Sequence, residues 1–167
     1  AMIRFDIAPD VMERVRAIAD HHHASVFMVV HAVYAALLAR LSATSDIVVG
    51  TPVSGRGEAS VDDLIGMFVG TVVLRTDVDS EQTFSSLIDQ VRDRDLSAFG
   101  HVDVPFERLV DVLNPVRSQS HSPLFQVALA YEYVEDTAFE LPDLRVSALE
   151  FDVTPAQFDL ALTLFES

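Results

Sequence analysis

The sequence predicts an α/β layer structure in which helices pack on a mixed sheet. Segments with apolar residues at helical spacing come in two pairs, and runs of β-branched residues separate and follow these pairs. We find no internal repeat, which argues against a solenoid. Because the chain has 167 residues and is 50% hydrophobic, it can build the core of one domain or of one lobe of a larger domain.

The first part of the chain predicts two helices and a strand. Pro9 at a first-turn position, followed by apolar residues at helical spacing, predicts an amphipathic helix that ends near His21. Ser25 is a candidate N-cap for a second helix that continues to about Leu41 and has apolar residues on nearly every face, so it should be buried on several sides. The β-branched run after it predicts a strand over Asp46 to Pro52.

The middle of the chain predicts a strand and two more helices. The run Phe68 to Arg75 predicts a strand at the centre of the sheet, and Thr83 to Ala98 has the spacing of a surface helix. Pro105 begins a helix that should end before Asn114, because the residue ahead of Pro115 disfavours α geometry. Further predicted elements are a short helix over Val61 to Leu64 and strands over Leu124 to Tyr133, Leu144 to Phe151 and Phe158 to Phe165.

The composition excludes several classes of function. The net charge of −15 repels nucleic acid and anionic lipid. The chain has no cysteine, hence no disulfide and no thiolate metal site. Its most apolar stretch, Val26 to Leu41, is shorter than the roughly 20 residues that span a bilayer, and no secretory signal precedes it. We therefore expect a cytoplasmic protein that binds neither nucleic acid nor membrane.

Clustered histidines and acidic runs invite a metal or acid–base interpretation that the spacing does not favour. Successive helical residues point about 100° apart, so His21-His22-His23 cannot converge on one ion, and we interpret them as a solvated helix end. His31 lies in the apolar helix and is interpreted as a core histidine. The runs Asp62-Asp63 and Asp93-Arg94-Asp95 are interpreted as solvated faces, and no metal site is expected. The chain contains no GxSxG, P-loop, HExxH or GxGxxG motif.

Four stretches carry a more specific signal. In chain order they read VGTPVSGR at 49–56, LIGMFVGTVVLR at 64–75, HVDVPFERLV at 101–110, and the stretch 117–127, which ends in SPLFQV. These resemble, in the same order and at matching spacing, the GTPVAGR, IGxFVNTxxLR, HQDVPFExLVE and RxxSRHPLFQV elements of the condensation domains of nonribosomal peptide synthetases. Gly70 stands where that family usually has Asn, and Val102 where it commonly has Gln.

The resemblance extends from Phe5 to about Phe165 and matches only the C-terminal lobe of the condensation domain, a chloramphenicol-acetyltransferase-like fold. It therefore implies that residues 1–167 are a C-terminal subdomain. The family's catalytic HHxxxDG motif belongs to the N-terminal lobe, and neither double histidine here is followed by Asp-Gly at the required places. We expect no catalytic residue in this chain and no activity from it alone. Ala1 ahead of Met2 suggests an excised piece of a longer protein.

The resemblance also implies a reaction and a set of partners. In the complete domain, two carrier proteins, peptidyl and aminoacyl, present thioesters on phosphopantetheine arms, and a peptide bond forms in a tunnel between the lobes. The chain itself should bind no cofactor, and its other neighbours would be the N-terminal subdomain and an adenylation domain. Gly66, Phe68, Gly70 and Thr71 are candidate tunnel-lining residues.

Arg56 is the candidate residue that supports the active site, because its side chain could pair with the aspartate of HHxxxDG. Alternatively, Arg56 simply caps a turn at the surface.

Three alternatives stay open for the function of the whole chain: a non-catalytic lobe that docks a carrier protein or a neighbouring domain, an inert fragment, and the C-terminal lobe of an epimerization or cyclization relative. The stretch 113–118 looks more like condensation domains that accept a D-configured donor.

Overall fold

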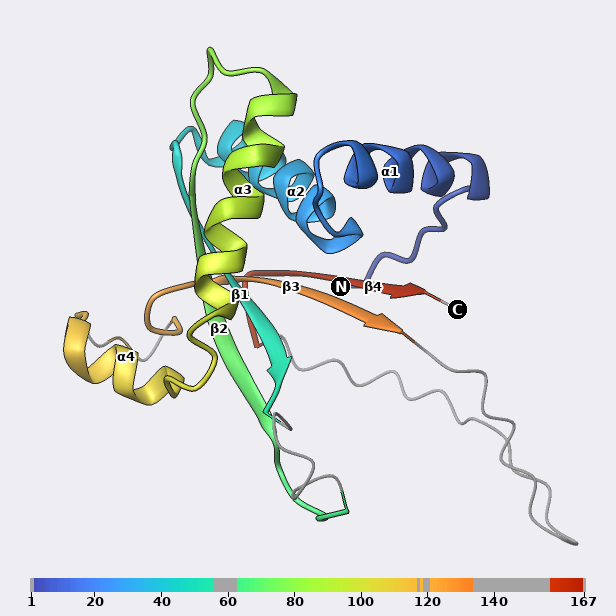
Figure 1. The fold of residues 1–167 in the computed structure, drawn as a ribbon. Helices are drawn as coiled ribbons and strands as arrows, with labels where there is room; N and C mark the ends of the chain where they lie inside the picture. The colour runs from blue at the N-terminus through green and yellow to red at the C-terminus, as the bar shows by residue number, and fades with distance from the viewer. Residues whose placement is uncertain (1, 56–62, 117, 119–120, 134–156, 167) are drawn as a thin grey trace, which may run out of the picture.

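The computed structural model describes residues 2–55, 63–116, 118, 121–133 and 157–166. Helices and strands alternate in mixed order along these residues (Figure 1). The elements are α1 (Pro9–His21), α2 (Val26–Ser42), β1 (Asp46–Ser54), β2 (Val69–Asp77), α3 (Phe84–Phe99), α4 (Phe106–Leu113), β3 (Val127–Tyr133) and β4 (Leu160–Glu166). The predicted α/β class is confirmed. The predicted strand at Leu144 to Phe151 lies outside the described residues, as does the first half of the predicted helix at Val61 to Leu64; its second half is not helical.

The strands form a mixed sheet in the order β2-β1-β3-β4. β1 and β2 are antiparallel along their whole length, from the pair Asp46 and Asp77 to the pair Ser54 and Val69. β3 runs parallel to both β1 and β4. The prediction of a central second strand is wrong, because within the described sheet β2 lies at an edge and β1 lies inside. Only alternate residues of β2 are buried, so only one face of this strand packs against the core. A run of β-branched residues is therefore compatible with an edge strand.

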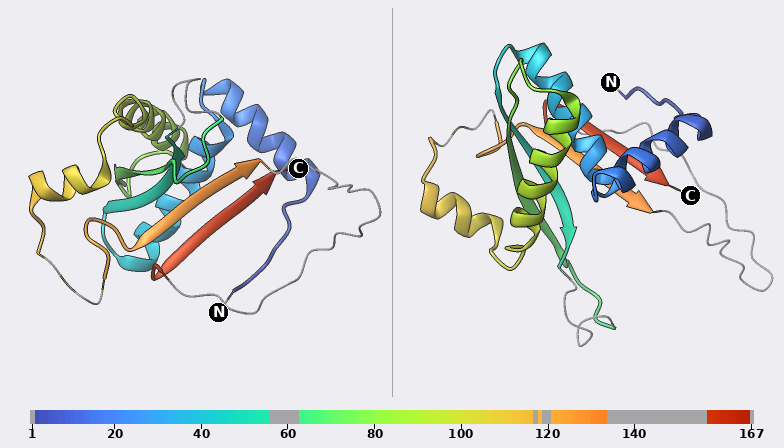
Figure 2. Two further views of the ribbon diagram at one scale, coloured as in Figure 1. Left: turned by 90° about the horizontal axis from the view of Figure 1, so that it is seen from below. Right: turned by 45° about the horizontal axis from the view of Figure 1, so that its top comes forward.

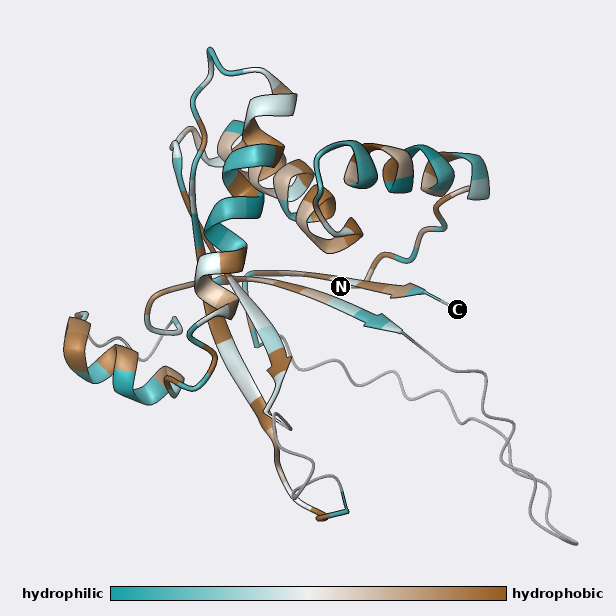
Figure 3. Ribbon diagram, in the orientation of Figure 1, coloured by the Kyte–Doolittle hydropathy of each residue, from teal (hydrophilic) through white to brown (hydrophobic). Residues whose placement is uncertain are grey.

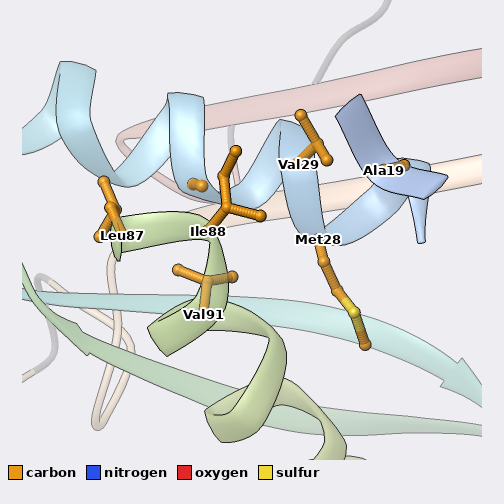
Figure 4. Packing of buried hydrophobic residues seen from close by; sticks show 7 residues of the cluster. Ala19, Met28, Val29, Leu87, Ile88 and Val91 are labelled. Atoms are coloured by element: carbon orange, nitrogen blue, oxygen red, sulfur yellow. The ribbon is translucent and has the colours of Figure 1, made fainter. Parts of the chain in front are cut away.

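Helices α2 and α3 pack side by side over one face of the sheet, α2 against β1 and α3 against β2, and α1 crosses the end of α2 (Figures 1 and 2). The prediction that α2 is buried on several sides is confirmed. One side of α2 joins α1 and α3 in a cluster with Met28, Val29 and Ala32. Figure 4 shows Met28 and Val29 of this cluster with Leu87 and Ile88 of α3. The other side of α2 meets the sheet through Tyr34, Ala35 and Leu38.

The helices begin and end within one residue of the positions that the sequence indicated. The hydroxyl of Ser25 accepts a hydrogen bond from the backbone N–H of Met28 at 3.2 Å, so Ser25 is the N-cap of α2. α1 ends at His21, and α4 ends one residue before Asn114, which adopts a left-handed conformation with φ of 42°.

The distribution of apolar residues over the four described helices agrees with this packing. α2 is apolar on most of its surface, whereas α1, α3 and α4 each carry a polar and an apolar side (Figure 3). Among the described residues no single helix is long and apolar enough to cross a bilayer, although α1 and α2 taken together, bent by 101° between them, reach that length and composition.

Candidate functional site

The first two sequence motifs form one paired unit. The segment 49–54 lies in β1 and 69–75 lies in β2, where Val53 faces Gly70 and Pro52 faces Thr71 across the antiparallel pair. The pairing extends beyond β1, because the N–H of Gly55 donates to the carbonyl of Phe68 at 2.5 Å. A side chain at position 55 would place a Cβ 2.7 Å from that carbonyl oxygen, so this close approach requires glycine.

The four candidate tunnel residues lie on and just before β2, but in different environments. Gly66 is exposed, whereas Phe68, Gly70 and Thr71 are half-buried. The ring of Phe68 turns back over Gly66, since a Cβ there would lie 3.2 Å from the ring. Gly70 alternates with the buried Val72 and therefore belongs to the helix-covered face, while Thr71 belongs to the opposite face. The structure thus brings these residues into one segment but not onto one surface.

The segment leading into β2 exposes large apolar side chains. We call Leu64, Ile65, Met67 and Val69 the strand tip; their exposed fractions are 52%, 105%, 88% and 63%. The strand tip thus places four large apolar side chains, each more than half exposed, within six positions of the chain. Surfaces of this kind mark contact sites for another protein or another domain.

The third and fourth motifs meet the first at an aromatic cluster. The ring of Phe125 lies 5.7 Å from that of Phe106 and 5.4 Å from that of Phe158, measured between centroids. Phe125 also covers Gly50 of β1 so closely that a Cβ at Gly50 would lie 2.1 Å from the ring. Sequence reasoning missed this cluster; the signal available was a glycine inside a β-branched strand, which often marks the close approach of another group.

The last residue of the second motif, Arg75, has a structural partner. Its Nε and one terminal nitrogen donate to the two carboxylate oxygens of Asp46 at 2.8 and 2.9 Å. This bidentate hydrogen bonding lowers the pKa of Asp46. The pair joins the start of β1 to β2, so Arg75 contributes to the register of these two strands and not to the strand tip. Arg56 lies outside the described residues.

The histidine run does not behave as a solvated helix end throughout. His22 caps α1 with only 11% of its side chain exposed, and its Nδ1 lies 2.9 Å from a carboxylate oxygen of Asp89 on α3. Its Nε2 lies 3.2 Å from the hydroxyl of Ser85. The interpretation as a solvated end is therefore wrong for His22, because α3 packs against the end of α1. Within the described part of the chain, no group of three possible ligands converges on a metal position.

The interpretation of His31 as a core histidine is confirmed. Its Nδ1 lies 3.0 Å from both carboxylate oxygens of Asp95, and both side chains are buried. Asp95 was interpreted as part of a solvated face, which is wrong, because it lies on the side of α3 that packs against α2. Helical spacing alone, with Asp95 four residues after Val91, could have placed it on the buried side.

A further cluster ties α1 to strands β3 and β4. Glu166 at the end of β4 accepts hydrogen bonds from Arg16 of α1 and from the hydroxyl of Tyr131 in β3, both at 2.6 Å. The hydrogen bonds from Tyr131 and Arg16 lower the pKa of Glu166, and burial together with the bond to Glu166 raises the pKa of Tyr131 to about 12. The cluster thus fixes α1 over the edge strand.

Comparison with known proteins places these motifs in a family. The sequence model of the Condensation domain family matches residues 1–167. The chain is 43% identical over 164 residues to a dimodular nonribosomal peptide synthase of Bacillus subtilis and 42% identical over 166 residues to an isonitrile lipopeptide synthase of Mycobacterium tuberculosis. These alignments cover 98% and 99% of this chain but only 7% of each relative, so the chain spans a small part of their length.

Solved structures share the fold. The X-domain from teicoplanin biosynthesis is 32% identical with a TM-score of 0.83 and matches 92% of this chain over 35% of its own length. A four-domain nonribosomal peptide synthetase, AB3403, is 29% identical with a TM-score of 0.76 over 79% of this chain and 10% of its own. Motif order, mixed sheet and these relatives agree: the chain belongs to the condensation-domain family of nonribosomal peptide synthetases.

Proposed function

We propose that the chain is the C-terminal lobe of a condensation domain and forms one wall of the site where two carrier-bound thioesters react. The acceptor amine attacks the donor thioester carbonyl, so a C–N bond forms, the C–S bond breaks, and the donor carrier keeps the thiol of its phosphopantetheine arm. The single observation that carries this proposal is the paired β1–β2 unit ending in the exposed apolar strand tip, because such a surface calls for a second lobe.

In this arrangement the chain acts through positioning. Two substrates held on tethered arms in a closed tunnel react far faster than free molecules, because their relative motion is already restricted. The catalytic histidine would come from the HHxxxDG motif of the other lobe, and the partners would be that lobe, two carrier proteins and an adjacent adenylation domain. The phosphopantetheine arms belong to the carriers, so this lobe needs no cofactor of its own.

The face of the sheet decides which candidate can line the tunnel. Thr71 lies on the face of β2 that α2 and α3 do not cover, together with Val69, whereas Gly70 lies on the helix-covered face. Gly66 and Phe68 precede the strand at the strand tip. We therefore propose that Thr71 supplies a wall of the tunnel, that Gly66 and Phe68 shape its approach, and that Gly70 permits close packing against Val53.

Arg56 follows Gly55, whose backbone is anchored to Phe68. We propose that Arg56 pairs with the aspartate of HHxxxDG across the lobe interface. A hydrogen-bonded charged contact of this type is worth about 1.5–3 kcal/mol, so Arg56→Ala in the full domain should lower the condensation rate about 10- to 100-fold. Arg56→Lys retains the charge but not the bidentate fork, so its rate should lie between those of Arg56→Ala and the unsubstituted domain. An Arg56→Ala domain that is folded and fully active would contradict the pairing.

A second candidate is a lobe that only docks another protein. A solved complex of the teicoplanin X-domain with another protein, OxyB, favours this second function. The matched chain in that complex is 31% identical to this chain, with a TM-score of 0.83. Product formation together with the N-terminal lobe separates the two functions, because a lobe that only docks another protein would give no product. Incubated alone with two loaded carriers, this chain should form no dipeptidyl product, since its own residues supply no catalytic histidine motif; product from the chain alone would contradict the proposed lobe function.

A further inference from the structure

Ser85, His22 and Asp89 lie in the order of a nucleophile, a base and a group that orients the base. The hydroxyl of Ser85 is 3.2 Å from His22 Nε2, and His22 Nδ1 is 2.9 Å from an Asp89 carboxylate oxygen. A carboxylate only accepts, so the hydrogen bond to Asp89 places the imidazole proton on Nδ1 and leaves Nε2 to accept the proton of the hydroxyl. This is the arrangement that activates a serine in enzymes of unrelated fold.

Neighbouring contacts hold the base and the carboxylate in place. His22 is nearly buried between α1 and α3, and Arg92 donates to the backbone carbonyl of His22 at 2.6 Å and to Asp89 at 3.2 Å. The hydrogen bond to His22 is the largest of the effects that lower the pKa of Asp89, so this carboxyl is ionised at neutral pH. The end of a helix does not require an imidazole that is held in place beside an ionised carboxylate, so this arrangement calls for another explanation.

The nucleophile, in contrast, is open to solvent. Ser85 is exposed in the first turn of α3, where Thr83 satisfies the N–H groups of Ser86 and Leu87. The N–H groups of Phe84 and Ser85 have no partner among the described residues. Unpaired N–H groups at a helix start can donate to an oxygen that becomes negative, as the carbonyl oxygen of an acyl group does during attack.

We propose that Ser85 is an acyl-accepting nucleophile that reacts with small activated esters and thioesters and then transfers the acyl group slowly to water. Ser85 Oγ bonds to the acyl carbon as its proton passes to His22 Nε2, the C–O or C–S bond breaks, and the leaving alkoxide or thiolate takes that proton. Water reverses the sequence and releases a carboxylic acid. Small acyl groups are expected because the exposed helix start offers no walls for a larger one.

The composition makes this reaction easy to detect. The chain has neither lysine nor cysteine, the side chains that ordinarily react with activated esters. With p-nitrophenyl acetate, one acetyl group should appear on Ser85 in peptide mapping by mass spectrometry as p-nitrophenolate is released. The N-acetylcysteamine thioester of acetate should give the same adduct more slowly. Ser85→Ala should remove this adduct, whereas Ser86→Ala, one residue along the same helix turn, should leave it unchanged.

Variants of the base separate catalysis from packing. His22→Asn should slow acetylation of Ser85 about 100-fold, the lower part of the range for a positioned general base. Asp89→Asn, which keeps an acceptor oxygen and disturbs packing least, should slow it at least about 10-fold. Circular dichroism checks the fold, and if His22→Asn unfolds, Asp89→Asn decides. Acetylation confined to the N-terminal amine or tyrosines, or a Ser85 rate that folded Asp89→Asn leaves unchanged, would overturn the proposal.

Discussion

The ring of Phe125 lies on the bare backbone of Gly50, in the space that any side chain there would occupy. A Cβ at Gly50 would lie 2.1 Å from the ring of Phe125, which is only 4% exposed and is held between Phe106 and Phe158. Segments about 75 residues apart in the sequence thereby share one contact. This contact joins the first and fourth motifs in the fold.

Gly50→Ala should therefore destabilise the chain by about 2 kcal/mol, because the trapped ring cannot yield without disturbing its aromatic neighbours. Urea unfolding followed by circular dichroism measures the change. Gly70→Ala on the neighbouring strand is the matched control, since its Cβ would meet a methyl group of Val53 at 3.3 Å and the Val53 carbonyl oxygen at 4.0 Å, but no ring. Adding Phe125→Leu to Gly50→Ala should recover part of the loss, and strictly additive effects would contradict the contact.

The buried pair of His31 and Asp95 should be sensitive to removal of one partner. Asp95→Ala leaves the Nδ1 of His31 buried without an acceptor and should cost about 3 kcal/mol, whereas Asp95→Asn retains an acceptor oxygen and should cost less. Asp93→Ala on the exposed side of α3 should change the free energy of unfolding by less than about 0.5 kcal/mol. Equal losses from Asp95→Ala and Asp93→Ala would show that the buried pair contributes nothing.

Tyr34 gives a pH-dependent prediction. Burial raises the pKa of Tyr34 to about 12, and its hydroxyl has no hydrogen-bond partner among the described residues. In the unfolded chain the phenol ionises near pH 10, so unfolding releases a proton above that pH. The contribution of neutral Tyr34 is complete below pH 10 and is lost as the pH rises towards 12.

Tyr34→Phe should consequently leave stability at pH 7 unchanged or raise it by up to about 1 kcal/mol, because an unpaired buried hydroxyl is removed. It should also flatten the loss of stability between pH 10 and 12, as measured by urea unfolding at each pH. Tyr133→Phe is the control, since Tyr133 is 70% exposed. An identical alkaline loss in Tyr34→Phe and the unsubstituted chain would contradict this assignment.

The strand tip should matter for association and not for folding. Ile65→Ser and Met67→Ser alter side chains that are 105% and 88% exposed, so each should change the free energy of unfolding by less than about 0.5 kcal/mol. Both should weaken binding of the N-terminal lobe about tenfold or more in isothermal titration calorimetry, because each removes apolar contact area. Val116→Ser, which is equally exposed at 90% near α4, is the control. Unchanged affinity would place the lobe interface elsewhere.

Sequence alone predicted the local elements well and their neighbours poorly. Helix limits followed from the N-cap at Ser25 and from Pro115, which disfavours α geometry at Asn114, because both effects are local. The edge position of β2, the pairing of Asp95 with His31 and the contact of Phe125 with Gly50 depend on residues far apart in the chain, which spacing and propensity do not encode. The four motifs pointed to the family, but their convergence on β1 needed the fold.

The central claim is that this chain is one of two complementary lobes, and the most direct measurement is product formation on mixing. The chain and the separately produced N-terminal lobe are combined with donor- and acceptor-loaded carrier proteins, and carrier-bound dipeptide is measured by mass spectrometry. The claim predicts product in the mixture and in neither lobe alone. No product from lobes that are both folded and bound to each other would contradict it and would favour a docking role.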